Sequence, residues 1–330
     1  MNKIDFVVTW VDSNDKKWIK EKEKYNPEKN TDTSIARYRD WDTLKYWFRG
    51  VEKYAPWVNK IYLITYGHVP KWLNLNNPKL VIVKHEDYMD KKYLPTFNSI
   101  PIELNMHKIK GLSEKFVYFN DDVFLIKDTK PTDFFKNDLP CDSEILMTST
   151  PVGENRFYNT LSNNTYIVNK YFNLKEVLRK NPFKWINLKY GSLVMRTLIL
   201  SLWNNFVGFK NLHLAVSYKK STFEKVWNLE HDYLDDICYQ KFRNNSTSVN
   251  HMLMEDYQFV TGEFYPRNIK FGKLFEIGDD NKKLFYAIKK QKYKCICIND
   301  IKEVDNIEKI KKEIQDCLCF ILPEKCSFEL

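Results

Sequence analysis

The stretch that decides the fold is Ile4–Val11, which reads I-D-F-V-V-T-W-V. β-Branched and aromatic side chains dominate it, and such residues favour β-strands over helices. The polar run Asp12–Asp15 follows at once, which predicts a buried strand that ends in a loop. Asp12 would then lie at the carboxyl end of this first strand.

Strands and helices alternate along the chain beyond this first strand. Runs of strand character are found at Lys60–Tyr66, Leu80–Val83 and Lys115–Asn120. Apolar residues recur at helical spacing in Trp41–Lys53, and a second helix is predicted over Asn98–His107. This alternation predicts an α/β fold with a doubly wound, mostly parallel, Rossmann-like sheet. Ligands of such sheets bind at the carboxyl ends of the strands.

Three segments differ in their pattern and suggest a domain organisation. Residues 1–139 form the N-terminal α/β part, and residues 140–266 are mainly helical, as an inserted or second lobe would be. In residues 267–330 we predict a strand at Lys294–Ile298 that rejoins the first part, followed by a helix over Ile301–Leu318. Cys295 and Cys297 alternate with isoleucines, which indicates a half-buried strand rather than a zinc site.

Composition narrows the functional class. The net charge is +9, and the stretch Leu178–Val226 holds nine Lys or Arg against one acidic residue. Such a stretch is either a solvated basic face or a surface for an anionic polymer or lipid head groups.

Glycine-rich dinucleotide and P-loop motifs are absent from the sequence, which argues against a Rossmann dehydrogenase and a P-loop ATPase. We find no signal peptide and no apolar run of about 20 residues, so we expect a cytoplasmic protein.

The pair Asp121 and Asp122 is the most informative local feature, since it directly follows the strand Lys115–Asn120. Magnesium is typically bound by one or two carboxylates together with substrate phosphates, and a pair at a strand end suits that role. A simple turn cap is an equally good interpretation. Asn120 adds a polar group where a core strand would have an apolar one.

Two other places carry polar groups with a possible chemical role. Arg37, Arg39 and Asp40 precede a predicted helix, where the arginines could bind phosphate. The simpler interpretation is that Asp40 is the N-cap of the helix and that the two arginines lie in a solvated loop. His213 has partly apolar neighbours, as a core histidine would, and Arg243 alone is typical of a surface.

Taken together, these residues resemble the Stealth family of bacterial capsule and cell-surface polysaccharide phosphotransferases, to which the animal lysosomal N-acetylglucosamine-1-phosphotransferase is also similar. The family has four conserved regions in order. The first resembles Ile4–Asp12; the second resembles runs within Arg37–Asp122; the third resembles the stretches around His213 and Phe242-Arg243; the fourth resembles Cys297–Asp300.

The resemblance implies a sheet similar to that of GT-A glycosyltransferases and a transfer of sugar phosphate. A UDP-hexose or UDP-N-acetylhexosamine would donate its sugar-1-phosphate to a sugar hydroxyl and release UMP. Arg37, Arg39 and Arg243 would clamp the diphosphate, Asp121 and Asp122 would hold Mg²⁺ or Mn²⁺, and Asp40 or His213 would accept the proton. Asp12, Asn98, Asn120, Asn299 and Asp300 would contact the donor.

Other functions stay open at this point. A GT-A-like glycosyltransferase would release UDP and form a glycosidic bond instead. A non-enzymatic polyanion-binding protein would explain the charge, but basic and aromatic residues do not interleave as in nucleic-acid-binding motifs, so we expect no nucleic-acid partner. The resemblance implies an oligosaccharide or polysaccharide acceptor that can be lipid-linked, and hence a location at the inner face of the cell membrane.

Overall fold

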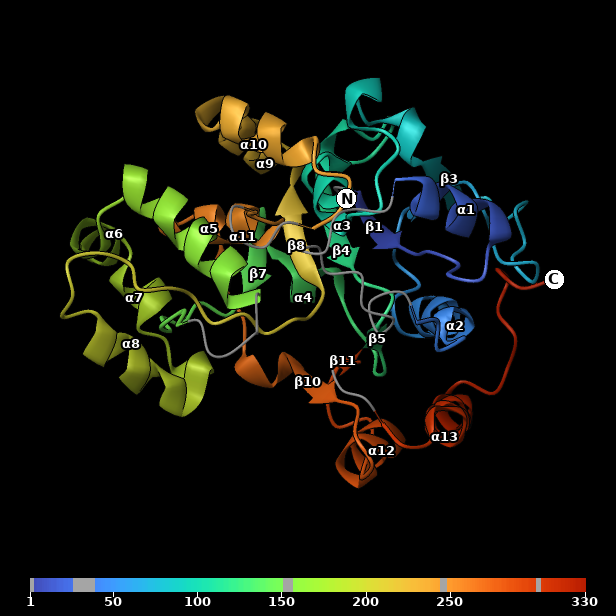
Figure 1. The fold of residues 1–330 in the computed structure, drawn as a ribbon. Coiled ribbons are helices and arrows are strands. Elements are labelled where there is room, and N and C mark those ends of the chain that lie inside the picture. Colours follow the sequence, from blue (N-terminus) through green and yellow to red (C-terminus); the bar gives the residue numbers. More distant parts are fainter. Residues whose placement is uncertain (1–2, 26–38, 151–156, 244–247, 301–303) are drawn as a thin grey trace.

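A five-stranded sheet forms the centre of the molecule, with the strand order β3-β2-β1-β4-β8 (Figure 1). The computed structural model describes residues 3–25, 39–150, 157–243, 248–300 and 304–330. The strands of this sheet are β1 (Ile4–Thr9), β2 (Ile61–Thr65), β3 (Leu80–Lys84), β4 (Lys115–Phe119) and β8 (Val216–Lys219). The first four are parallel, and β8 runs antiparallel to β4. The predicted α/β class and its mostly parallel sheet are therefore confirmed.

Both faces of this sheet are covered, which explains why its strands are apolar at nearly every position. In β1, Phe6 and Val8 point into one buried cluster, and Val7 points into another on the opposite face. Helix α2 (Leu44–Tyr54) contributes to the first cluster, whereas α9 (Lys220–Leu229) contributes to the second. Parallel sheets are stable in this doubly covered form because helical crossovers occupy both faces.

Asp5 is the one acidic residue in β1, and it is fully buried. Its Oδ1 accepts hydrogen bonds from the Asn59 side chain at 2.6 Å and from the Lys60 backbone N–H at 3.1 Å. Its Oδ2 accepts one from the Ser113 backbone N–H at 2.7 Å. A buried carboxylate is tolerated when such donors satisfy it. Asp5 thus ties the loops that lead into β2 and β4 to the start of β1.

The remaining elements surround this sheet. The other helices are α1 (Lys16–Lys24), α3 (Ser99–Leu104), α4 (Pro131–Phe134), α5 (Phe157–Tyr171), α6 (Leu174–Lys180), α7 (Pro182–Trp185), α8 (Val194–Leu200), α10 (His231–Cys238), α11 (Met252–Val260), α12 (Lys282–Lys289) and α13 (Ile307–Ile321). Short 3-10 helices occur at His85–Asp87, Lys91–Tyr93, Met106–Lys108, Leu188–Leu193 (η5) and Ile269–Phe271. Among the described residues, no helix is long and apolar enough to cross a membrane.

A second, smaller sheet corrects the expectation for the C-terminal strand. It consists of β10 (Gly272–Glu276), β11 (Cys295–Asn299) and β5 (Val123–Leu125), while β6 (Phe135–Lys136), β7 (Leu139–Asp142) and β9 (Tyr265–Pro266) form a third. The strand predicted at Lys294–Ile298 is β11, and it pairs with β5 of the N-terminal part rather than with the main sheet. It is buried on both faces, not half-buried, because both sets of its side chains pack into the same core as α13.

Close packing holds this second sheet against the first part of the chain. Gly50 of α2 faces β5, where a Cβ atom would lie 2.7 Å from the carbonyl oxygen of Leu125. Only glycine lets helix and strand approach so closely. The mainly helical stretch between residues 140 and 266 is likewise joined to the centre, because it supplies β8 to the main sheet.

The start of α2 differs from its prediction in a way that matters for the site. The helix begins at Leu44, its N-cap is Thr43, and Asp40 therefore does not cap it. Instead, the Asp40 Oδ1 accepts a hydrogen bond from the Asp42 backbone N–H at 2.7 Å, and Asp42 adopts a left-handed φ of 52°. This turn separates Asp40 from the helix and leaves it on the wall of a cavity.

Candidate active site

A cavity of about 760 Å³ opens at the carboxyl ends of the parallel strands. Each strand contributes the residue or residues that follow it: Trp10 after β1, Tyr66 after β2, His85 after β3 and Asn120 after β4. Side chains after parallel strands converge at one edge of a sheet, and this edge is where ligands of such folds bind. The cavity therefore lies where the strand pattern predicts it.

Most of the predicted site residues line this one cavity. They are Arg39, Asp40, Asn98, Asn120, Asp121, Asp122, His213, Arg243, Asn299 and Asp300. Arg37 lies outside the described residues. Asp12 is not among the lining residues; its backbone N–H donates to His68 Nε2 at 2.8 Å, and its carboxylate accepts from the Asn14 N–H at 2.9 Å. Asp12 therefore orders the loop behind the cavity edge.

Asp121 and Asp122 occupy a tight turn between β4 and β5. The Val123 backbone N–H closes this turn by donating to the Asn120 carbonyl at 3.1 Å. Although Asp121 is open to the cavity, burial among protein atoms and the nearby charges of Asp122 and Asp40 raise its pKa to about 7. Burial also raises the pKa of Asp122. Carboxyls that repel one another in this way bind a cation favourably, since the cation relieves the repulsion.

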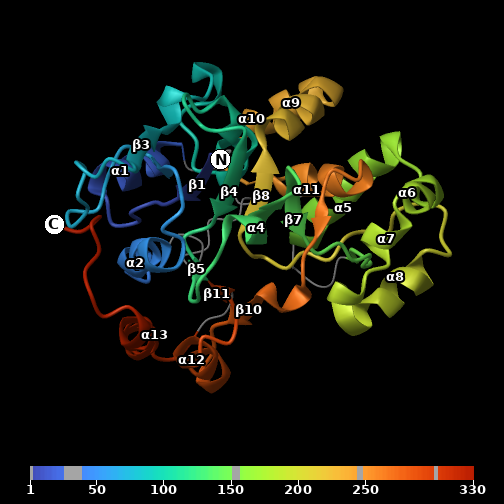
Figure 2. The same ribbon diagram turned by 180° about the vertical axis from the view of Figure 1, so that it is seen from behind.

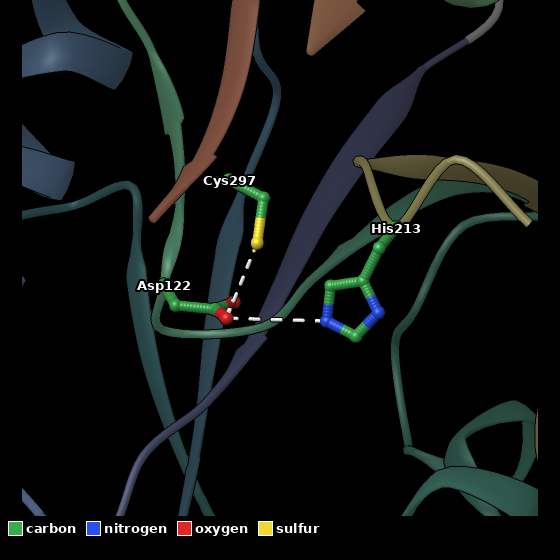
Figure 3. Close-up of side chains that lie close together, drawn as sticks. All are labelled: Asp122, His213 and Cys297. Carbon is green, nitrogen blue, oxygen red and sulfur yellow. Dashed lines mark hydrogen bonds and ion pairs between the residues drawn. The ribbon is translucent and has the colours of Figure 1, made fainter. Parts of the chain in front are cut away.

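Asp122 is the centre of a small cluster of possible metal ligands (Figure 3). The Cys297 thiol of β11 donates to its Oδ2 at 3.2 Å, and His213 Nε2 lies 3.9 Å from the same oxygen. The ligand atoms of the three residues all lie within 4.8 Å of one another. The other oxygen of Asp122, Oδ1, is buried and accepts no hydrogen bond from the described residues.

The backbone of His213 is held in an unusual conformation. Its φ is 49°, in the left-handed region that a side chain with a Cβ rarely adopts. The Asn211 side chain stabilises it by accepting the His213 backbone N–H at 2.6 Å. Strained residues of this kind cluster at functional sites, where the surrounding structure fixes the side chain.

Asn120 approaches the same imidazole from β4. The Tyr118 hydroxyl donates to Asn120 Oδ1 at 2.7 Å, which turns the amide nitrogen toward His213 Nε2 at 3.5 Å. In that orientation the amide offers only its N–H groups to the imidazole.

Two arginines reach the cavity from distant parts of the chain. Arg39 Nη1 donates to Asp300 Oδ2 at 2.9 Å, and the same oxygen accepts from the Trp41 indole at 3.2 Å. Arg243 Nη2 donates to the Ser99 hydroxyl at 2.9 Å. Asp300 thus orients Arg39 at the edge of the cavity.

Asn98 and Asn299 are placed differently from each other. Asn98 is buried; its Oδ1 caps α3 by accepting from the Ile100 N–H at 3.1 Å, and its Nδ2 donates to the Gln240 carbonyl at 3.2 Å. The amide of Asn98 therefore shapes the cavity wall. Asn299 ends β11 and lines the cavity beside Asp300.

Several cavity residues were not predicted from the sequence. His251 is buried and His85 is half-buried, and desolvation among protein atoms lowers the pKa of His85 to about 4 and lowers the pKa of His251, so both are neutral near pH 7. Glu103 is buried, with its Oε1 3.3 Å from the Tyr118 hydroxyl oxygen. Cys297 is not among the lining residues but contacts Asp122. His85 had a usable signal, since it lies two residues after the predicted strand Leu80–Val83, and Cys297 was included in the fourth family region; Glu103 and His251 had no signal.

An α/β architecture with acidic, imidazole and guanidinium groups gathered at the carboxyl edge of its sheet defines an enzyme. Family models of the Stealth protein conserved region 1 and conserved region 2 match residues 2–29 and 37–141. A capsular polysaccharide phosphotransferase WcwK of Streptococcus pneumoniae is 47% identical over 332 residues, covering 100% of this chain and 98% of the relative. The exopolysaccharide phosphotransferase cps2G of Lactiplantibacillus plantarum is 41% identical, covering 99% and 96%.

The chain belongs to the Stealth family, and it is a phosphotransferase. The similarity to the relatives spans the whole chain, including the parts around His213, Arg243 and Asp300 where we expect the third and fourth regions. Among solved structures, the galactosyltransferase LgtC aligns with a TM-score of 0.44 and 8% identity, covering 95% of each chain.

Proposed function

We propose that this enzyme transfers a hexose-1-phosphate or N-acetylhexosamine-1-phosphate from a UDP-sugar to a sugar hydroxyl of a capsular or cell-surface polysaccharide. One observation carries the proposal. A single cavity joins a carboxylate pair, two arginines and two possible bases, in a chain that is similar over its full length to capsular polysaccharide phosphotransferases.

The reaction is a substitution at phosphorus. The acceptor oxygen forms a bond to the β-phosphorus of the UDP-sugar, and the bond from that phosphorus to the bridging oxygen breaks. UMP leaves with the bridging oxygen, and the acceptor hydroxyl gives up its proton to the enzyme. The bond between the sugar and its phosphate is untouched, so the anomeric configuration is retained and a phosphodiester is formed.

Positioning and charge neutralisation are the main tasks of an enzyme that transfers a phosphoryl group. Arg39 and Arg243 line the cavity and are suited to the diphosphate, because a guanidinium offers two parallel donors to phosphate oxygens. Arg37 is expected to assist them. Asn299 and Asp300 border the same space and are candidates for contacts with the sugar or the nucleotide.

A divalent cation fits the acidic end of the cavity. The residues that would hold it are Asp121 and Asp122, and the unpartnered Oδ1 of Asp122 supports this assignment. Bound there, Mg²⁺ or Mn²⁺ would neutralise charge on the diphosphate. His213 and Cys297 complete a set of oxygen, nitrogen and sulfur ligands, and such a mixed set suits Mn²⁺ better than Mg²⁺, which prefers oxygen.

Either Asp40 or His213 accepts the proton of the acceptor hydroxyl, and the other orients it. Two observations support Asp40 as the base. Burial raises the pKa of its carboxyl from the usual value, which strengthens it as a base. His213 Nε2 belongs to the ligand cluster around Asp122, and a nitrogen that binds a cation has no lone pair left for a proton.

The acceptor is proposed to be an oligosaccharide or polysaccharide, carried on a lipid during assembly, and the enzyme to work at the inner face of the cell membrane. The chain needs no helix across the membrane for such a location, since a peripheral attachment is sufficient.

A nucleotide-release assay tests the proposed function. The purified enzyme is incubated with a panel of UDP-sugars, Mn²⁺ or Mg²⁺ and oligosaccharide acceptors, and the released nucleotide is identified. We expect UMP with one of the donors, and a rate at least about 100-fold lower for Asp122→Asn and Arg243→Ala. Release of UDP would contradict the proposal and would favour a glycosyltransferase.

A further inference from the structure

Eight large apolar side chains are exposed on one short part of the chain, within α7, η5, α8 and the residues after them. They are Phe183, Ile186, Leu188, Met195, Leu198, Ile199, Leu202 and Trp203. Leu188 is 96% exposed and Phe183 83%. Single exposed apolar residues are ordinary on protein surfaces, but a contiguous patch marks a site of interaction. We call these eight residues the apolar face.

Helix α8 shows that the exposure of this face is built into the fold. Met195, Leu198 and Ile199 of α8 and Leu202 in the turn after it recur at i, i+3, i+4 and i+7, which is the spacing of a helical stripe that normally faces a core. Here all four are exposed. The side of α8 that is buried carries Thr197, whose hydroxyl accepts the Leu146 backbone N–H at 3.2 Å. This hydrogen bond holds α8 in the orientation in which its apolar stripe faces the solvent.

Positive charge accompanies the apolar face. Five of the nine Lys or Arg between Leu178 and Val226 lie on α6, α7, η5 and α8, and the stretch from Leu178 to Trp203 has no acidic residue. Arg179, Lys180 and Arg196 are exposed on or beside the helices that carry the face. A second copy of a chain with a net charge of +9 would be repelled by this surface, whereas an anionic surface would be attracted.

The apolar face lies on the same part of the molecule as one wall of the active-site cavity. Helices α6, α7 and α8 form the outer edge of the molecule in both views, well apart from α12 and α13 (Figures 1 and 2). Behind α8, the chain continues from Leu146 into Met147, Thr148 and Ser149, which line the cavity. The face thus lies on the outside of one cavity wall.

We propose that the apolar face is a docking surface for a membrane rich in anionic phospholipid. The apolar side chains enter the boundary between head groups and acyl chains, and the surrounding lysines and arginines bind the head groups. A patch of this kind lies in the interface plane and does not span the bilayer. Docking brings the cavity close to an acceptor carried on a lipid. The delivery of the cavity to a lipid-linked acceptor rests on the proposed function, whereas membrane binding by the apolar face does not.

Vesicle flotation tests this assignment directly. The full chain is mixed with vesicles of phosphatidylcholine alone or with phosphatidylglycerol added, and bound protein is measured at low and high salt. We expect binding to the anionic vesicles that weakens as salt increases, because salt screens the attraction to the head groups. The double variant Leu188→Glu with Leu202→Glu is expected to reduce this binding at least about tenfold, since it replaces apolar contacts with negative charge.

A matched control tests whether vesicle binding depends on the apolar face in particular or on any exposed apolar side chains. Tyr286 on α12 and Phe320 on α13 are 59% and 65% exposed, so Tyr286→Glu with Phe320→Glu makes the same change elsewhere. We expect that control to bind vesicles as the parent does. Both double variants should keep the parent circular dichroism spectrum and the parent rate of UMP release with a soluble acceptor.

Three results would overturn the proposal. These are equal vesicle binding by both double variants, binding that does not depend on anionic lipid, and a dimer in solution that the Leu188→Glu with Leu202→Glu change dissociates. The last result would assign the face to a second copy of the chain. The vesicle assay needs no donor or acceptor, so a failure of the proposed reaction would leave its outcome unaffected.

Discussion

At the scale of single residues, Asp122 connects three distant parts of the chain. Its carboxylate contacts the thiol of Cys297 from the C-terminal part and lies near His213 from the mainly helical part. Burial and the negative charge of Asp122 raise the pKa of Cys297, so the thiol is protonated and donates its hydrogen bond when no cation is present. A bound transition metal would replace that proton.

Replacing Cys297 by serine tests whether its sulfur helps to select the metal. We expect Cys297→Ser to weaken Mn²⁺ or Co²⁺ binding about 10–100-fold, as the loss of a ligand contact does, and to leave Mg²⁺ binding nearly unchanged. Isothermal titration calorimetry measures both. Cys295→Ser is the matched control, since Cys295 lies two residues earlier on the same strand outside the cluster. Equal losses for the two metals would contradict the prediction.

Metal binding is also expected to depend on pH through Asp121. The pKa of this carboxyl is raised to about 7, so below pH 7 it holds a proton that must leave before a cation binds. The affinity for Mn²⁺ should therefore fall about tenfold for each pH unit below 7 and level off above it. Titrations between pH 5.5 and 8.5 measure this. Asp121→Asn should bind weakly with a shallower dependence on pH, and an unchanged slope in this variant would exclude Asp121 as the source.

The sequence predicted the position of residues on the cavity wall where they follow a strand in a recognisable pattern. Asp121 and Asp122 line the cavity for the reason that their position after an apolar strand suggested. Cys297 was placed in a strand and in the fourth family region but not beside Asp122, because no spacing links it to an aspartate 175 positions away. The capping role expected for Asp40 was wrong, because the left-handed turn at Asp42 has no signature in the sequence.

At the scale of elements, one wall of the cavity depends on a glycine. Gly208 has a φ of 132°, and a Cβ atom there would lie 2.2 Å from the Ser149 hydroxyl and 2.5 Å from the Met147 carbonyl oxygen. The Gly208 carbonyl accepts the Met147 N–H at 3.0 Å, which holds the cavity-lining segment in place. Both the backbone conformation and the close approach therefore require glycine.

We expect Gly208→Ala to destabilise the protein by about 1–3 kcal/mol, since it adds backbone strain and a steric clash. Urea unfolding followed by fluorescence measures the free energy of unfolding. Gly278→Ala is the control, because no atom lies within 4 Å of a Cβ built at that glycine. Equal stability of the two variants would mean that the wall adapts to the added methyl group.

A buried carboxyl near the edge of the helical part gives a second prediction at this scale. Glu144 is fully buried, and neither of its side-chain oxygens accepts a hydrogen bond from the described residues. Burial raises its pKa well above the usual value, so the folded protein keeps a proton on Glu144 that the unfolded chain loses above about pH 4.5. Stability is therefore lost as pH rises from the unfolded pKa toward the folded one.

Glu144→Gln should remove this dependence because glutamine stays neutral. We expect it to raise the free energy of unfolding by about 1–3 kcal/mol at pH 7.5 and by little at pH 4.5. Thermal unfolding at the two pH values measures the difference. Glu114→Gln on the exposed surface is the control. A gain that is equal at both pH values would show that the ionisation of Glu144 does not affect stability.

At the scale of the whole molecule, the first four strands were predictable and the assembly around them was not. Strands β1, β2 and β4 bury both faces, and β3 is partly buried at the sheet edge, which produces apolar runs that are visible in the sequence. In contrast, β8 is a short edge strand, and β11 is paired with β5 through contacts across about 170 residues. Such pairings depend on tertiary packing, which local patterns do not encode.

The same long-range assembly explains why the site is complete only in the folded chain. Arg39 precedes the first large helix, Asp300 follows β11, and their ion pair joins the two ends of the molecule at the cavity. The N-terminal part alone would lack His213, Arg243 and Asp300. We therefore assign the proposed transfer of sugar phosphate to the whole chain.

The most direct test of this account follows one phosphorus atom. The enzyme is given a UDP-sugar labelled with ³²P at the β-phosphate, together with Mn²⁺ and a polysaccharide acceptor, and the label is located after phosphatase treatment. We predict that the label enters the polymer in a phosphatase-resistant diester while unlabelled UMP is released. Label that is released as UDP, and then as inorganic phosphate by the phosphatase, with an unlabelled sugar in the polymer would contradict the proposed attack at phosphorus.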